Sequence, residues 1–158
     1  MGQCLSVNVL DWMTDAKLRL CSHEERGIWF DVMCLLHVSS EYGVLRQRLE
    51  DIARAVGTTK DVLEDLVRKR VLRGRSADSL PTDELFSLSG LPLIYAPSHA
   101  GQKGQEVVLL EEQEGHIWFS DKMLIARHKQ ANASSRAKTT GKRVTLQSAS
   151  AQASNGRW

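Results

Sequence analysis

Two short helical patterns on either side of one glycine, between Leu49 and Leu72, constrain the fold of this 158-residue chain most strongly. The apolar positions of the two patterns are Leu49, Ile52, Ala53, Val56, Val62, Leu63, Leu66 and Val67. Gly57 ends the first pattern, and Thr58 and Thr59 offer hydroxyl N-caps for the second. Two helices joined by a turn of about three residues with a glycine form a helix-turn-helix. The same local pattern also fits an ordinary antiparallel helix pair, so the rest of the chain must decide.

A longer helix is predicted before this pair, and it begins at a capping box. Ser22 stands three residues before Glu25, so each side chain can bind the backbone N–H of the other residue. The apolar face that follows consists of Ile28, Trp29, Val32, Met33, Leu35 and Leu36. Gly27 lowers helix propensity inside the first turns, so we expect another backbone to approach there. This helix is the predicted centre of the core.

The third signal is a predicted β-hairpin, with strands over 107–110 and 116–119. A two-stranded hairpin is marginal alone and must pack on helices. Three helices followed by a hairpin is the order of a winged helix-turn-helix, with the hairpin as the wing. The predicted fold class is therefore α+β, with a winged-helix domain over 1–130, an insertion at about 73–105, and a basic, disordered tail over 131–158.

The segments between these elements give weaker signals. Residues 7–20 mix apolar and charged positions, and we interpret them as a short strand that covers the core. Within the insertion, 83–88 fits one or two helical turns and 91–95 a short extended segment. A new helix begins at Asp121, and the Ser/Ala/Gln-rich sequence after Val144 predicts disorder.

Charge divides the chain sharply, although the formal net charge is only +2. Residues 1–121 carry 13 Lys+Arg and all 19 Asp+Glu, a net of −6, whereas residues 122–158 carry eight Lys+Arg and no acid. A basic segment on a mildly acidic body is common in proteins that contact nucleic acid or another polyanion. The alternative is a solvated tail without a partner.

In a helix-turn-helix, the second helix enters the major groove while Lys and Arg side chains hold phosphates. Here the outer face of that helix also carries Asp61, Glu64 and Asp65, which match phosphate poorly. The basic segment after Asp121 is the stronger electrostatic footprint, and we expect binding to be steeply salt-dependent. The candidate contacts with double-stranded DNA are Lys60, Arg68, Lys69, Arg70, Lys122, Arg127, Lys129, Arg136, Lys138, Lys142 and Arg143.

A family resemblance adds to this interpretation. The residues that carry it are Asp11-Trp12, Leu18-Arg19-Leu20-Cys21-Ser22 and Glu25-Arg26-Gly27-Ile28-Trp29-Phe30-Asp31-Val32-Met33. This opening resembles the N-terminal domain of phage and prophage replication proteins, the lambda-O-like replisome organisers, over roughly residues 8–143. The resemblance implies a winged helix, DNA binding in replication initiation, a helicase or helicase loader as protein partner, and the cytoplasm of a bacterial host. The long 73–105 segment and the end of the chain soon after the basic helix favour a stand-alone DNA-binding or regulatory member.

Two other non-enzymatic functions stay open. The acidic outer face of the second helix fits a winged-helix interaction module that binds a host replication or defence protein, and a phage transcriptional regulator could use the same scaffold. No Gly-rich phosphate loop, HExxH, GxSxG or CxxC pattern is present. We therefore expect no catalytic residues and no cofactor.

Metal and membrane sites are not expected either. Cys21 and His23 lie about 20 Å along one helix from Cys34 and His37, too far apart for one zinc ion, and Cys34 is interpreted as a small buried residue. No apolar run approaches the ~20 residues of a membrane span, and three Cys fit a reducing cytoplasm. The first six residues match the N-myristoylation pattern, which we interpret as a chance match.

Overall fold

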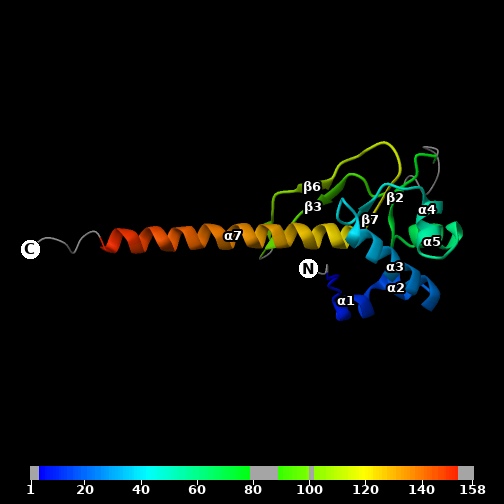
Figure 1. The fold of residues 1–158 in the computed structure, drawn as a ribbon, viewed down its shortest axis with the longest axis horizontal. Coiled ribbons are helices and arrows are strands. Elements are labelled where there is room, and N and C mark those ends of the chain that lie inside the picture. The colour runs from blue at the N-terminus through cyan, green and yellow to red at the C-terminus, as the bar shows by residue number, and fades with distance from the viewer. Residues whose placement is uncertain (1–3, 79–88, 100–101, 153–158) are drawn as a thin grey trace, which may run out of the picture. The chain divides into compact units, whose positions relative to one another are not determined.

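The computed structural model describes the backbone of residues 4–78, 89–99 and 102–152, and side chains within 4–78, 89–98 and 104–138. It is an α+β protein, as the sequence predicts, with short antiparallel sheets (Figure 1). The chain forms two compact units, residues 1–124 and 125–158. The elements are α1 (Val9–Thr14), α2 (Ala16–Arg19), α3 (His23–Val38), β1 (Val44–Leu45), α4 (Leu49–Ala55), α5 (Lys60–Arg68), β2 (Arg73–Arg75), β3 (Leu93–Tyr95), β4 (Ser98–His99), β5 (Gln102–Lys103), β6 (Val107–Leu110), β7 (Ile117–Phe119) and α7 (Asp121–Gln152).

Helix α3 begins at the predicted capping box. The backbone N–H of Glu25 donates to Ser22 Oγ at 3.1 Å, and the backbone N–H of Ser22 donates to Glu25 Oε2 at 2.6 Å. Its inward side buries Trp29, Val32 and Leu36, and the helix packs on α5 and β1. The prediction of a central core helix is confirmed.

The predicted pair of short helices is present as α4 and α5. Gly57 has a φ of +70°, and the turn closes as a Schellman motif, in which the N–H of Gly57 donates to Arg54 O and that of Thr58 to Ala53 O. The hydroxyl-capping prediction is wrong, because Thr59 is the N-cap of α5 and its side chain makes no capping hydrogen bond. Apolar burial against α3 holds the pair in place instead.

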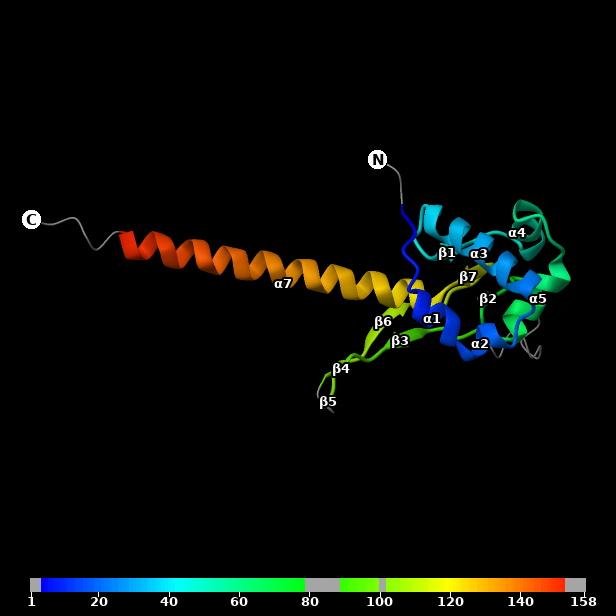
Figure 2. The same cartoon turned by 90° about the horizontal axis from the view of Figure 1, so that it is seen from below.

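The strand pairing differs from the predicted hairpin. β7 is the central strand of a sheet with order β1-β7-β2, in which Val44 pairs with Phe119 and Gly74 with Trp118. β6 pairs with β3 instead, and β4 with β5, so the 73–105 segment supplies strands (Figure 2). A hairpin of β6 with β7 is therefore wrong. Burial explains why β6 pairs with β3, because Leu110 of β6 and Leu93 of β3 are buried in one apolar cluster with residues of β7.

All three residues of β7 are buried, and they alternate between two apolar clusters. Trp118 packs with the helices, and its Nε1–H donates to Gln47 O at 3.1 Å. Ile117 and Phe119 point to the other face, into a smaller cluster with Leu93. Helices thus cover one face of the sheet and the β3–β6 ribbon covers the other.

The strand predicted over 7–20 is wrong, since this region forms α1 and α2. Each helix has an Asx N-cap: Asn8 Oδ1 accepts from the N–H of Asp11 at 3.1 Å, and Asp15 Oδ1 from the N–H of Lys17 at 2.8 Å. These caps favour helical turns in a segment whose mixture of apolar and charged residues we interpreted as a strand.

Several predictions fall at or beyond the limits of the described chain. The backbone of α7 is helical to Gln152, through the stretch where the sequence predicts a disordered tail, and residues 153–158 lie outside the described residues. Gly2, the acceptor in the lipidation pattern, and the 83–88 segment also lie outside them. No helix in the described ranges combines the length and apolar character needed to cross a membrane.

Candidate nucleic-acid interface

The first candidate DNA contact, Lys60 at the start of α5, is held by carboxylates of its own chain. Its Nζ lies 2.8 Å from Glu50 Oε1 and 3.6 Å from Glu64 Oε1. The hydrogen bond to Glu50 raises the pKa of Lys60, and the same bond lowers the pKa of Glu50. The pair thus stabilises the charged form of both side chains. A phosphate must compete with two carboxylates for this ammonium group.

The cations at the other end of α5 are paired as well. Arg68 contacts Asp65 Oδ1 at 2.6 Å and Glu64 Oε2 at 3.6 Å. The ammonium group of Lys69 donates to Glu25 Oε1, and this hydrogen bond is the main cause that lowers the pKa of Glu25. Arg70 is exposed and has a φ of +57°, two residues after the end of α5. Three of the four candidate contacts in this helix pair are therefore committed to carboxylates.

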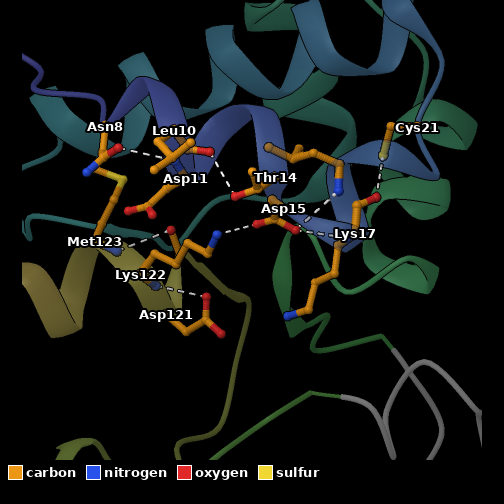
Figure 3. A network of polar contacts seen from close by, with 12 residues as sticks. Asn8, Leu10, Asp11, Thr14, Asp15, Lys17, Cys21, Asp121, Lys122 and Met123 are labelled. Carbon is orange, nitrogen blue, oxygen red and sulfur yellow. Dashed lines mark hydrogen bonds and ion pairs between the residues drawn. The ribbon is translucent and has the colours of Figure 1, made fainter.

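Lys122, in the first turn of α7, is also committed to the protein. Figure 3 shows its side chain pointing toward Asp15, with which it forms an ion pair. Burial raises the pKa of Asp15, but the hydrogen bonds from Lys122 and from the backbone N–H groups of Lys17 and Leu18 outweigh burial and lower it overall. Lys122 thus neutralises a largely buried carboxylate that also caps α2.

The candidate contacts farther along α7 have different surroundings. The side chains of Arg127, Lys129, Arg136 and Lys138 are exposed, and the chain has no acidic residue after Asp121. Lys129 and Arg136 are seven residues apart, so they share one side of the helix, and Arg127 and Lys138, eleven apart, share another. Lys142 and Arg143 lie on the helical backbone of α7, beyond the described side chains.

The strands around β7 add little positive charge, although they contain two arginines. Arg73 Nη1 lies 3.4 Å from Asp121 Oδ2, and Arg75 Nη1 lies 4.0 Å from Glu112 Oε1. The link from β6 to β7 carries three exposed carboxylates, those of Glu111, Glu112 and Glu114. The predicted wing is therefore acidic here, and it lacks the cations that phosphate contacts need.

The cysteines differ from the sequence interpretation. Cys34 is exposed on α3, not buried, whereas Cys21 is buried and desolvation raises the pKa of its thiol. In the described ranges, no three His, Cys, Asp or Glu side chains are grouped closely enough to hold a metal ion.

Sequence reasoning missed a second surface, an apolar groove of about 670 Å³ between α1 and α3. Val9 and Trp12 of α1 line one side, and Ile28 and Phe30 of α3 line the other. The Trp12 and Phe30 rings meet edge to face, with centroids 6.1 Å apart. The three-residue spacing of Val9 and Trp12 is typical of one face of a helix. We did not recognise this face because we interpreted 7–20 as a strand.

Comparisons with models of protein families, with curated proteins and with solved structures find no match to this chain. Its function must therefore be argued from its own geometry and charge.

Proposed function

We propose that this protein is a non-enzymatic, winged-helix DNA-binding protein of the replication-initiation type, which grips duplex DNA mainly through α7. The order of elements supports the winged-helix part of the proposal. Along the chain, β1 lies between α3 and α4, α5 follows α4, and β2 and β7 come next with a long ribbon between them. In this proposal α4 and α5 form the helix-turn-helix, and the ribbon that includes β3 and β6 is an enlarged wing.

The observation that carries the DNA-binding part is the contrast in where the carboxylates of the chain lie relative to its cations. On α5, Lys60, Arg68 and Lys69 pair with carboxylates. After Asp121 the chain offers cations and no carboxylate at all. Counterion release from DNA rewards each Lys or Arg that replaces a condensed cation, and a cation already paired with a carboxylate gains less from the exchange.

The expected binding mode follows from this contrast. The basic side chains of α7 hold phosphates without reading sequence, because phosphate contacts carry no base information. α5 contributes orientation more than affinity, since Asp61, Glu64 and Asp65 lie on or beside its outer face. A helicase or its loader is the proposed protein partner, and the bacterial cytoplasm is the proposed location.

The test compares two matched variants of the full chain, each lacking four positive charges. The first replaces Arg127, Lys129, Arg136 and Lys138 by Gln, and the second replaces Lys60, Arg68, Lys69 and Arg70 by Gln. Affinity for a labelled random duplex is measured by fluorescence anisotropy over a range of salt concentrations. The α7 variant should lose most of its affinity, and its log K against log salt should become shallower by about 3 to 4 units.

The α5 variant should bind nearly as well as the parent chain, because three of its four lost cations, Lys60, Arg68 and Lys69, were already paired with carboxylates. Equal losses in both variants would contradict the partnering argument. Failure of the parent chain to bind duplex DNA would reject DNA binding altogether. Circular dichroism on both variants checks that the helices remain intact.

A second function, docking a host replication or defence protein, is favoured by the same acidic face. Asp61, Glu64 and Asp65 present three carboxylates on α5, and two of them, Glu64 and Asp65, form ion pairs with cations of the same helix. If the parent chain does not bind DNA, a pull-down from host lysate with an Asp61→Lys, Asp65→Lys control isolates this alternative.

A further inference from the structure

The cations of α7 lie along two opposite edges of the helix. Figure 1 shows α7 as one continuous helix, and its side chains are described to residue 138. An α-helix turns about 100° per residue, so Lys129 and Arg136, seven residues apart, form one edge within about 20°. Arg127 and Lys138, eleven residues apart, form a second edge within about 20°. The 129/136 edge and the 127/138 edge lie about 160–180° apart around the helix axis, and their side chains are exposed.

The residues between the two edges are small or polar. From 126 to 138 the sequence is ARHKQANASSRAK, without a large aliphatic or aromatic side chain. A membrane-surface helix needs an apolar face, and a coiled coil needs apolar residues that repeat along one seam. Single-stranded nucleic acid is held by stacking of its bases on aromatic side chains. None of these three partners therefore fits this stretch of α7.

The major groove of duplex DNA does fit the two opposite edges. The groove is about 12 Å wide and admits an α-helix, whose diameter with side chains is about 10–12 Å. The phosphate backbones of the two strands border the groove on either side. A helix seated between them needs cations on two opposite sides, whereas a helix that lies along one backbone needs cations on one side only.

We infer that α7 lies in the major groove of B-form DNA, with the 129/136 edge on the phosphates of one strand and the 127/138 edge on those of the other. The inference rests on the proposed function and deepens it, because it names the groove and the form of nucleic acid that α7 accepts. The small residues between the edges let the helix approach the floor of the groove: Ala126, Ala131, Ala133, Ser134, Ser135 and Ala137. Double-stranded RNA does not fit, because its major groove is deep and narrow.

The test compares three matched variants of the full chain, each lacking one Lys and one Arg of α7. Two of them remove one edge each: Lys129→Gln with Arg136→Gln, and Arg127→Gln with Lys138→Gln. The third, Arg127→Gln with Lys129→Gln, removes one cation from each edge. Fluorescence anisotropy on a labelled random duplex should show losses of affinity that agree within about threefold, and each salt slope should become shallower by about 2. Circular dichroism checks that α7 stays helical.

Two further probes separate insertion into the groove from attraction by charge alone. Double-stranded RNA of the same length carries as many phosphates as the DNA, and it should bind about tenfold more weakly or worse. A DNA duplex whose cytosines carry a glucosylated 5-hydroxymethyl group has its major groove obstructed, and it should also bind about tenfold more weakly or worse. The variant in which Lys60, Arg68, Lys69 and Arg70 are replaced by Gln should keep both preferences, which assigns them to α7 and not to α5.

The possible failures are distinguishable. If the parent chain binds no duplex DNA, the proposed function and this inference both fail. If the parent chain binds DNA, but one edge variant keeps the parent affinity while the other loses most of it, α7 lies along a single backbone and only this inference is overturned. Equal affinity for DNA, RNA and the glucosylated duplex also overturns it, because charge alone then explains the binding.

Discussion

The ammonium group of Lys69, directly after α5, donates a hydrogen bond to the carboxylate of Glu25, in the first turn of α3 and 44 residues earlier in the chain. The same carboxylate closes the capping box at the start of α3. One side chain therefore caps a helix with one oxygen and binds the end of α5 with the other. A DNA phosphate could therefore bind Lys69 only if the hydrogen bond between Lys69 and Glu25 breaks.

Stability should fall in acid partly through Glu25. Its pKa is lowered in the folded protein, first by the hydrogen bond from Lys69 and then by the backbone N–H of Ser22. A depressed carboxyl pKa contributes stability above the ordinary glutamate pKa, and this stability is lost as the pH falls through the lower folded-state pKa. Urea unfolding of Glu25→Gln should therefore show a smaller loss of stability below about pH 4 than the parent chain.

Glutamine keeps an acceptor for the capping box, so the comparison isolates the charge. Ser22→Ala is the control: it should lower the free energy of unfolding by about 1 kcal/mol and leave the loss of stability at acid pH unchanged. If Glu25→Gln loses as much stability in acid as the parent chain, other carboxylates dominate the pH dependence.

The β2–β7 pairing should depend on Gly74. Gly74 has a φ of +137°, and a Cβ there would lie 1.9 Å from the carbonyl oxygen of Ile117. Because that neighbour is backbone, Gly74→Ala must open the sheet, and we expect a loss of about 2–5 kcal/mol in the free energy of unfolding. Gly57→Ala, in open space at a φ of +70°, should cost only about 1–2 kcal/mol. Similar losses in urea melts of the two variants would contradict the backbone clash.

The helices were predictable where local signals agree. The capping box at Ser22 and the apolar spacing around Gly57 each define a helix within a few residues, so α3, α4 and α5 follow from the sequence. Pairing partners depend on distant residues: β6 joins β3 because Leu110 and Leu93 are buried together, which no local pattern encodes. The cations of the candidate site could be predicted one by one, but the carboxylates that pair with them could not. The partners of Lys69 and Lys122 lie 44 and 107 positions away in the sequence.

Removing the imidazole of His37 should stabilise the protein. Neither ring nitrogen has a hydrogen-bond partner among the described residues, and the ring meets Tyr42 edge to face with centroids 5.3 Å apart. An unsatisfied buried polar group costs about 1–3 kcal/mol. His37→Phe keeps the aromatic contact and removes both nitrogens, so thermal unfolding should show a gain of about 1 kcal/mol. His37→Ala loses the ring as well and should destabilise; a loss of stability in His37→Phe as well would mean that the nitrogens are satisfied in solution.

Lys122 and Lys138 allow a structural cation to be compared with a proposed DNA contact on the same helix. Both are exposed on α7, but Lys122 neutralises Asp15, whose side chain is only 11% exposed. A phosphate that recruited Lys122 would leave this carboxylate without its partner. Lys138→Gln should therefore weaken duplex binding uniformly across sequences and reduce the salt slope by about 1. Lys122→Gln should change DNA affinity much less and lower the free energy of unfolding instead.

The measurement pairs fluorescence anisotropy on a labelled duplex with urea unfolding of both variants. Asp15→Asn adds a third arm, because it releases Lys122 from its carboxylate while an amide oxygen still caps α2. If ion pairing is what withholds Lys122 from DNA, Asp15→Asn should bind duplex more tightly than the parent chain and show a steeper salt slope. A Lys122→Gln variant that loses as much affinity as Lys138→Gln would mean that the pair with Asp15 opens readily when phosphate is present.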